Sequence, residues 1–115
     1  MTPIPMKDIQ MFDDAIYYPL LISVLQQDQE HFKNGPFKLK SPYINLIDKV
    51  LTKVHNDFRE NRIYLQRNKM EVARGENNGT FTEYIFVYNG IEDRRRYLNA
   101  RLRNRTEELL NEYLQ

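Results

Sequence analysis

The dipeptide Asn78-Gly79, which precedes the apolar run "FTEYIFVY" (81–88), constrains the fold of this chain more than any other local feature. Asn-Gly is the preferred central pair of a two-residue β-hairpin turn, because both positions need a positive φ. We therefore predict a hairpin over residues 69–88, with Val72 opposite Ile85. This register pairs aliphatic side chains across the strands. The other face of the second strand would carry Tyr84, Phe86 and Tyr88.

Two helical patterns precede the hairpin. Apolar residues recur at three- and four-residue steps from about Asp8 to Phe32, which predicts a first amphipathic helix. Pro19 lies inside it and lacks a backbone N–H, so we expect a kink or a break into two helices there. After a loop over residues 33–42, Ser41 is expected to cap a second helix, with Pro42 at its first position, that runs to about Leu65.

Gly90 is expected to release the chain into a third helix, from about Glu92 to Tyr113. The predicted fold class is α+β and predominantly helical. It has three main helices, the first kinked or split at Pro19, and one β-hairpin between helices two and three. A chain of 115 residues is the size of one domain, so we expect a single domain over residues 1–115. A two-stranded ribbon is marginal in water, so it must pack on the helices or extend a sheet with a second subunit.

Six arginines fall within residues 94–105 of a chain whose formal net charge is +1. If this segment is helical, a step of about 100° per residue defines one apolar seam. The seam would contain Leu98, Leu102, Leu109 and Tyr113. The arginines flanking it on one side would be Arg94, Arg101 and Arg105. Because the six guanidinium groups together encircle such a helix, structural and interfacial arginines are the preferred interpretation over a phosphate-binding stripe.

Charge is unevenly distributed along the chain. Residues 1–35 carry two basic and five acidic side chains (−3), residues 36–74 carry nine and four (+5), and residues 75–115 carry six and seven (−1). The acidic first third can therefore pair with the basic middle third, within one chain or between two. The basic middle segment and the arginine-rich third helix leave nucleic-acid binding open as the alternative function.

The sequence contains no convincing catalytic or metal-binding pattern. It has no cysteine, and Asp28 and His31 share a helical face with only His55 left to complete a metal site. Ser23 and Ser41 lack the glycine-flanked elbow of a catalytic serine. The four glycines form no phosphate-binding pattern. We therefore expect no enzymatic activity, no metal and no cofactor.

The hydropathy pattern predicts a cytoplasmic protein without a membrane partner. No apolar run approaches the ~20 residues that a bilayer-spanning helix needs. The longest run, residues 17–25, has no basic leader of the kind that signal peptides carry. The absence of cysteine also suits a reducing compartment.

Self-association is the function that the sequence favours. The strand over residues 80–88 is apolar on both faces, and a ribbon covered by one helical layer would leave one face in water. Arginine and tyrosine are also enriched at protein interfaces. We therefore predict a small, non-catalytic protein-interaction module that forms a homodimer. The expected interface residues are Tyr84, Phe86, Tyr88, Arg94, Arg101 and Arg105.

Three short stretches carry a resemblance to a known family: "PFKLK" (36–40), "GTFTEY" (79–84) and "NARLRNRTEELL" (99–110). They resemble the YhjD-like group, a family of small uncharacterised Bacillus proteins. The similarity extends over most of the chain, from the first predicted helix onward. It implies a Gram-positive cytoplasmic setting and brings no assigned fold, activity or catalytic residues with it.

Overall fold

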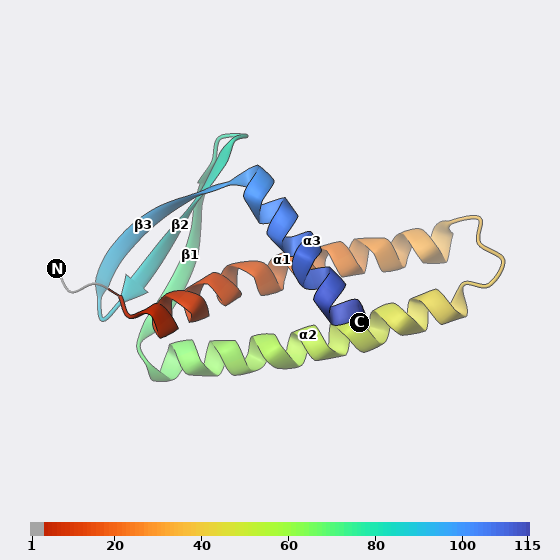
Figure 1. Ribbon diagram of the computed structural model, residues 1–115, viewed down its shortest axis with the longest axis horizontal. Coiled ribbons are helices and arrows are strands. Elements are labelled where there is room, and N and C mark those ends of the chain that lie inside the picture. Colours follow the sequence, from red (N-terminus) through yellow and green to blue (C-terminus); the bar gives the residue numbers. More distant parts are fainter. Residues whose placement is uncertain (1–3) are drawn as a thin grey trace.

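A computed structural model describes residues 4–115, which form three helices and one three-stranded sheet (Figure 1). The helices are α1 (Met6–Asn34), α2 (Ser41–Arg67) and α3 (Asn99–Leu114). The strands are β1 (Met70–Asn77), β2 (Phe81–Tyr88) and β3 (Ile91–Leu98). The sheet is antiparallel in the order β1-β2-β3. The α+β class with a hairpin after the second helix is confirmed, but the sheet has a third strand that the sequence analysis did not predict.

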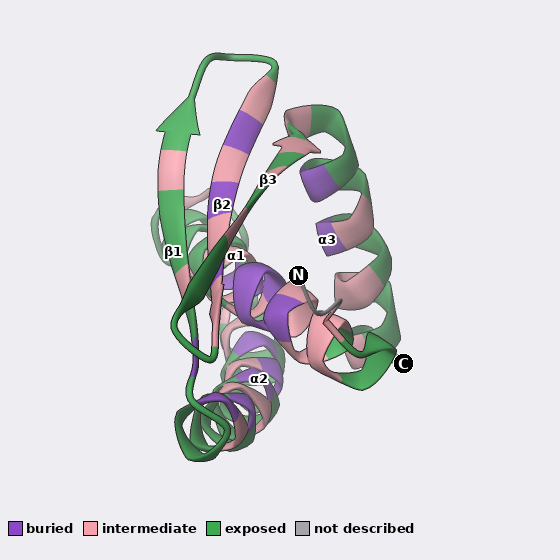
Figure 2. Ribbon diagram, turned by 90° about the vertical axis from the view of Figure 1, so that its left-hand side faces the viewer, coloured by how far each residue is buried: buried purple, intermediate pink, exposed green. Residues whose placement is uncertain are grey.

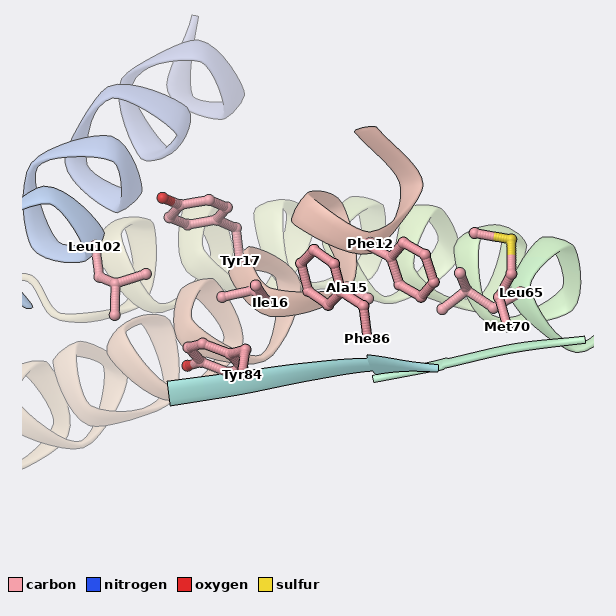
Figure 3. Packing of buried hydrophobic residues seen from close by; sticks show 9 residues of the cluster. All are labelled: Phe12, Ala15, Ile16, Tyr17, Leu65, Met70, Tyr84, Phe86 and Leu102. Carbon is pink, nitrogen blue, oxygen red and sulfur yellow. The ribbon is translucent and has the colours of Figure 1, made fainter. Parts of the chain in front are cut away.

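Helix α1 is the central element of the fold. It lies antiparallel to α2, and in Figure 2 it is placed between the sheet and α3. Two clusters of buried side chains share it. The first, shown in Figure 3, contains Phe12, Ala15, Ile16, Tyr17, Leu65, Met70, Tyr84, Phe86 and Leu102. The second contains Leu21, Leu25, Ile47, Val50 and Val54.

The predicted split of the first helix at Pro19 is wrong, and a kink there is not confirmed. Helix α1 continues from Met6 to Asn34 with Pro19 inside it. A proline in a helix interior costs about 3 kcal/mol. Each large apolar side chain that becomes buried contributes about 1.5–3 kcal/mol, and α1 buries Phe12 and Ile16 before the proline and Leu21 and Leu25 after it. Packing on both sides therefore outweighs the local cost.

The second helix ends close to its predicted position, but its predicted cap is wrong. Ser41 is the first residue of α2, and Lys40 occupies the cap position without a side-chain hydrogen bond. Pro42 lies in the first turn, at the second residue of α2 and not at the first as predicted. Its missing N–H would have no partner in a first turn, so the helix starts there at no cost in hydrogen bonding.

The hairpin is confirmed, but its predicted register is wrong by one residue. Val72 pairs with Phe86, and Ala73 takes the place opposite Ile85. One cause is the turn, which lies one residue later than predicted: the Asn78 N–H donates to the Phe81 carbonyl at 3.0 Å. The side chain of Asn78 stabilises this turn by accepting from the N–H groups of Thr80 and Phe81.

A β-bulge in β1 is the second cause. A turn that lies one residue later shifts the partner of each β1 residue by two positions along β2. An extra residue in β1, between Arg74 and Asn77, reduces this shift to one position. The net slip of one residue exchanges the two faces of β1. As a result Met70 and Val72 lie on the same face of the sheet as the aromatic residues of β2.

The predicted start of the third helix near Glu92 is also wrong, because residues 91–98 form β3. Asn89 and Gly90 both have positive φ, 52° and 80°, and Tyr88 pairs with Ile91. This is the geometry of a two-residue hairpin turn with Asn-Gly at its centre. The same signal that predicted the first hairpin is therefore present a second time in the sequence.

Gly90→Ala tests the second turn. A Cβ at this position meets nothing within 4 Å, so the expected cost is the strain of a left-handed backbone alone. We expect the free energy of unfolding to fall by about 1–2 kcal/mol, measured by urea titration. The matched variant Asn89→Gly should stay within about 0.5 kcal/mol of the wild type, because glycine adopts positive φ freely. Equal stability of Gly90→Ala and the wild type would contradict this turn.

Candidate functional site

Two of the aromatic residues predicted as an interface, Tyr84 and Phe86, lie on the inner face of the sheet, against α1 (Figure 3), and the ring of the third, Tyr88, lies 6.5 Å from that of Phe12. Tyr84 is 7% exposed and Phe86 is 0% exposed, while Tyr88 is half-buried. The ring of Phe86 stacks on that of Phe12, with centroids 4.4 Å apart and planes 4° from parallel. Packing within one chain therefore occupies this aromatic face, and the second face of the sheet becomes the candidate site.

The outer face of the sheet carries an apolar strip, which consists of Phe81, Ile85 and Val87 of β2. These side chains alternate with the inner residues along the strand and are half-buried by their neighbours on β1 and β3. Ala73 lies beside Ile85 on β1, and Leu98 lies beside Phe81 on β3 with 46% of its surface exposed. Within residues 4–115, no helix covers this face, as Figure 2 shows.

Charged residues border the apolar strip. Arg94, one of the predicted interface residues, lies on β3 and contacts two carboxylates, Glu83 at 2.9 Å and Glu92 at 3.7 Å. Arg96 lies over the ring of Phe81, with 4.2 Å between its guanidinium carbon and the ring centroid. The outer face therefore combines an apolar centre with both signs of charge.

The arginines do not encircle one helix, because Arg94, Arg95 and Arg96 belong to β3. Arg95 points to the inner face, where it pairs with Asp93 at 3.0 Å. The predicted apolar seam is correct for α3 alone. Leu102 is buried and Leu109 and Tyr113 are partly buried, whereas Leu98 belongs to the strand.

The other two predicted interface arginines lie on α3, away from the outer face of the sheet. Arg101 is exposed, and Arg105 is half-buried and pairs with Glu108 at 2.9 Å. The structure therefore places the six predicted interface residues on three surfaces: the inner face, the outer face and α3. Only Arg94 borders the apolar strip.

Three aspartates of α1 and α2 accept hydrogen bonds from tyrosines of other elements, and the sequence analysis missed these contacts. The pairs are Tyr64 and Tyr88 to Asp8 (2.8 and 3.1 Å), Tyr97 to Asp13 (2.8 Å), and Tyr113 to Asp57. They attach both β2 and β3 to α1, and α3 to α2. The partners are 56 to 84 residues apart in the sequence, so no local pattern could have revealed them.

Burial and these hydrogen bonds raise the pKa values of the tyrosine hydroxyls. Burial is the larger cause for Tyr97 and Tyr113, and the bond to the carboxylate adds to it. For Tyr64 the bond to Asp8 is the larger cause of its raised pKa. A neutral hydroxyl donates to a carboxylate, whereas a tyrosinate would be repelled by it. The pairs therefore hold the fold together only while the tyrosines stay protonated.

The candidate metal ligands do not converge. Asp28 and His31 are exposed on the last turns of α1, and His55 is exposed on α2. In the described part of the chain, no three ligating side chains come close enough to hold a metal ion. Ser23 is exposed on α1 and Ser41 starts α2. None of the helices described by the structure is both long enough and apolar enough to cross a membrane.

By its fold, the chain is a small α+β protein. A helical hairpin supports a three-stranded antiparallel meander with one open face, and a C-terminal helix follows. The chain belongs to the YhjD protein family, whose family model matches residues 3–115. It is 34% identical over 104 residues to the uncharacterised protein YhjD of Bacillus subtilis (strain 168), covering 90% of this chain and 87% of that protein. No solved structure matches the chain. The family resemblance seen in the sequence is confirmed.

Proposed function

We propose that this chain is a small cytoplasmic bacterial protein, a non-catalytic interaction module that self-associates through the outer face of its sheet. The observation that supports this most directly is the apolar strip Phe81, Ile85 and Val87, which no element of residues 4–115 covers. Open apolar surface marks contact sites on soluble proteins, and here Glu83 alone interrupts it, between Phe81 and Ile85. A second copy is the occupant we favour, because the surface bears both signs of charge.

The charges on the outer face support pairing with an identical surface. Glu83 and Glu92 lie beside Arg94 and Arg96 on this face, and Glu71 lies on β1, across β2 from Glu92, by the register of the three strands. In a two-fold dimer each copy presents the same patch to its partner. Acidic and basic residues of one copy can then meet their opposites on the other, while the apolar strips pack as two stacked sheets about 10 Å apart.

The size of the outer face sets the strength of this association. Three strands of eight residues cover roughly 25 Å by 14 Å, which is on the order of 350 Å² per copy. Stable interfaces bury about 800 Å² per partner. The expected dimer is therefore weak and transient, with a dissociation constant in the range of about tens to hundreds of micromolar.

Sedimentation equilibrium tests the self-association. We expect the apparent mass of the wild type to rise with concentration, and Ile85→Lys with Val87→Lys to keep the chain monomeric, because two ammonium groups would be buried in the contact. The matched control is Ile63→Lys, at a residue that is 40% exposed and lies on α2 and not on the sheet. A wild type that stays monomeric up to about 500 µM, a concentration above the expected dissociation constant, contradicts the proposal. Equal effects of the control variant and the double variant also contradict it.

The non-catalytic part of the proposal rests on the lack of a nucleophile, phosphate-loop or ligand pattern in the sequence. A single substitution that abolished a measured turnover would overturn it. Nucleic-acid binding, the alternative, has less support because Arg94, Arg95 and Arg105 each pair with a carboxylate. An affinity for DNA or RNA that fell about tenfold or more between about 50 and 200 mM salt would favour that alternative.

A further inference from the structure

A large open groove lies between the helical layer and strand β1. Its volume is about 1020 Å³, at the upper end of the range for small-molecule sites. The groove exists because β1 leaves the helices along its length. Met70 is buried at the start of β1, Val72 is half-buried and Arg74 is exposed. The second half of the strand therefore has no helix packed against it.

The wall of the groove is largely apolar and comes from α1, α2, β1 and β2. The apolar side chains that form it include Ile16 and Leu20 of α1, Phe58 and Leu65 of α2, and Met70 and Val72 of β1. Pro19, an exposed residue, also lines it. An open apolar surface of this kind is unfavourable in water and suits an aliphatic ligand.

Three cations border this apolar wall: Arg62, Lys69 and Arg74. All three are exposed, and within residues 4–115 none has a carboxylate within 4.0 Å. Glu71 is the one acidic residue of the lining, so three positive charges face one negative charge and the net charge is +2. Arg62 is further held in place by the ring of Phe58, with 4.5 Å between its guanidinium carbon and the ring centroid.

We propose that this groove binds an anionic amphiphile, a molecule with an acyl chain and a carboxylate or phosphate head. The acyl chain would lie along the apolar side chains of α1 and α2. The head would lie among Arg62, Lys69 and Arg74, which offer charge-assisted hydrogen bonds to its oxygens. Val87 and Ala73 of the outer face also line the groove, but the proposed acyl-chain and head-group contacts are made by other residues, so the proposal does not depend on self-association.

Arg62 and Lys69 lie at the C-terminal part of α2 and the connection to β1, while Arg74 lies further along β1 beside Tyr84. Cations from two elements therefore approach the groove from different positions along its length. A single anionic head group contacting two of them would bridge α2 and β1. Such bridging favours an amphiphile over a neutral aliphatic molecule of the same length.

Isothermal titration with sodium dodecanoate, below its micellar concentration, tests the proposal. We expect one molecule bound per chain, and binding of dodecanol at least about tenfold weaker, which corresponds to about 1.4 kcal/mol. The combined variant Arg62→Gln, Lys69→Gln and Arg74→Gln should also bind dodecanoate at least about tenfold more weakly. Dodecyl phosphate, titrated in parallel, distinguishes a carboxylate head from a phosphate head by which of the two binds more tightly.

The matched control is Lys49→Gln, Lys53→Gln and Arg67→Gln, which removes the same charge from exposed residues of α2 outside the groove. It should bind dodecanoate within about twofold of the wild type. Equal binding by the two combined variants overturns the proposal, and so does equal binding of dodecanol and dodecanoate. Inorganic phosphate that binds as tightly as dodecanoate would show that the apolar wall plays no part. If the groove variant does not fold, wild-type affinity that is insensitive to ionic strength overturns the proposal instead.

Discussion

Phe86→Ala is expected to lower the free energy of unfolding by about 3–5 kcal/mol, a large part of the 5–15 kcal/mol typical of a domain. Phe86 has no exposed surface and stacks on Phe12 with ring centroids 4.4 Å apart. Removing the ring takes away this contact and leaves a cavity between β2 and α1, which closes only in part. Guanidinium titration at low protein concentration, where self-association is absent, measures the change.

Ile85→Ala is the matched control for Phe86→Ala, because it removes an apolar side chain from the next position of the same strand. Ile85 points to the outer face and is half-buried, so its loss should cost less than half as much. A cost for Ile85→Ala equal to that of Phe86→Ala would mean that the faces of β2 are exchanged. Phe86→Leu, which keeps most of the apolar volume, should retain a measurable unfolding transition if Phe86→Ala does not fold.

Stability is expected to fall steeply above about pH 10, the ordinary pKa of tyrosine. Burial is the largest cause of a raised pKa at five tyrosines that pack between elements: Tyr17, Tyr18, Tyr84, Tyr97 and Tyr113. Above pH 10 the unfolded chain loses these protons while the folded chain keeps them. The folded state then binds more protons than the unfolded state, so the free energy of unfolding decreases as the pH rises.

Each such tyrosine steepens the decrease by at most about 1.4 kcal/mol per pH unit, and less where solvent screens it. Several together should unfold the protein between about pH 10 and 12. Circular dichroism and tyrosinate absorbance, followed in one alkaline titration, should change together. Full ionisation of the tyrosines without loss of circular dichroism would contradict the expectation.

Tyr97→Phe and Tyr113→Phe test which hydroxyls cause the alkaline unfolding. Each variant keeps its ring but loses the proton and the bond to Asp13 or Asp57. We expect about 1 kcal/mol less stability at neutral pH, from the lost hydrogen bond, and a shallower decrease above pH 10. A slope equal to that of the wild type would show that these two groups do not control it.

Periodicity predicted both long helices because their apolar stripes repeat through several turns. It failed at residues 91–98, where the alternation Asp93, Arg95, Tyr97 consists of polar and aromatic residues that also suit a helix surface. The sequence did contain the deciding signal, Asn89-Gly90, whose two residues both have positive φ. A second hairpin turn so soon after the first converts the expected ribbon into a meander.

For the candidate site, the sequence predicted that one face of the sheet is open to water. It assigned the aromatic face of β2 to the interface, whereas in the structure the aliphatic face is the open one. With a two-stranded ribbon in the predicted register, the aromatic face and the aliphatic face of β2 are equally suited to cover the helices. The bulge near Gly75 brings Met70 and Val72 to the aromatic side, so that side is the one α1 covers. The outer face thus became the open one through a shift of a single residue.

The sequence by itself determined the α+β class, the approximate outer ends of the two long helical segments, the presence of a hairpin and the family, because each depends on patterns within a short stretch of chain. Only the tertiary structure decided that α1 continues through Pro19, which face of the sheet is open, which tyrosines meet which aspartates, and where the groove lies. These features depend on contacts between different elements of the chain, such as the bond that Asn61 donates to the Met11 carbonyl, 50 positions away. No local preference encodes such contacts, since their free energy exists only when the elements pack together.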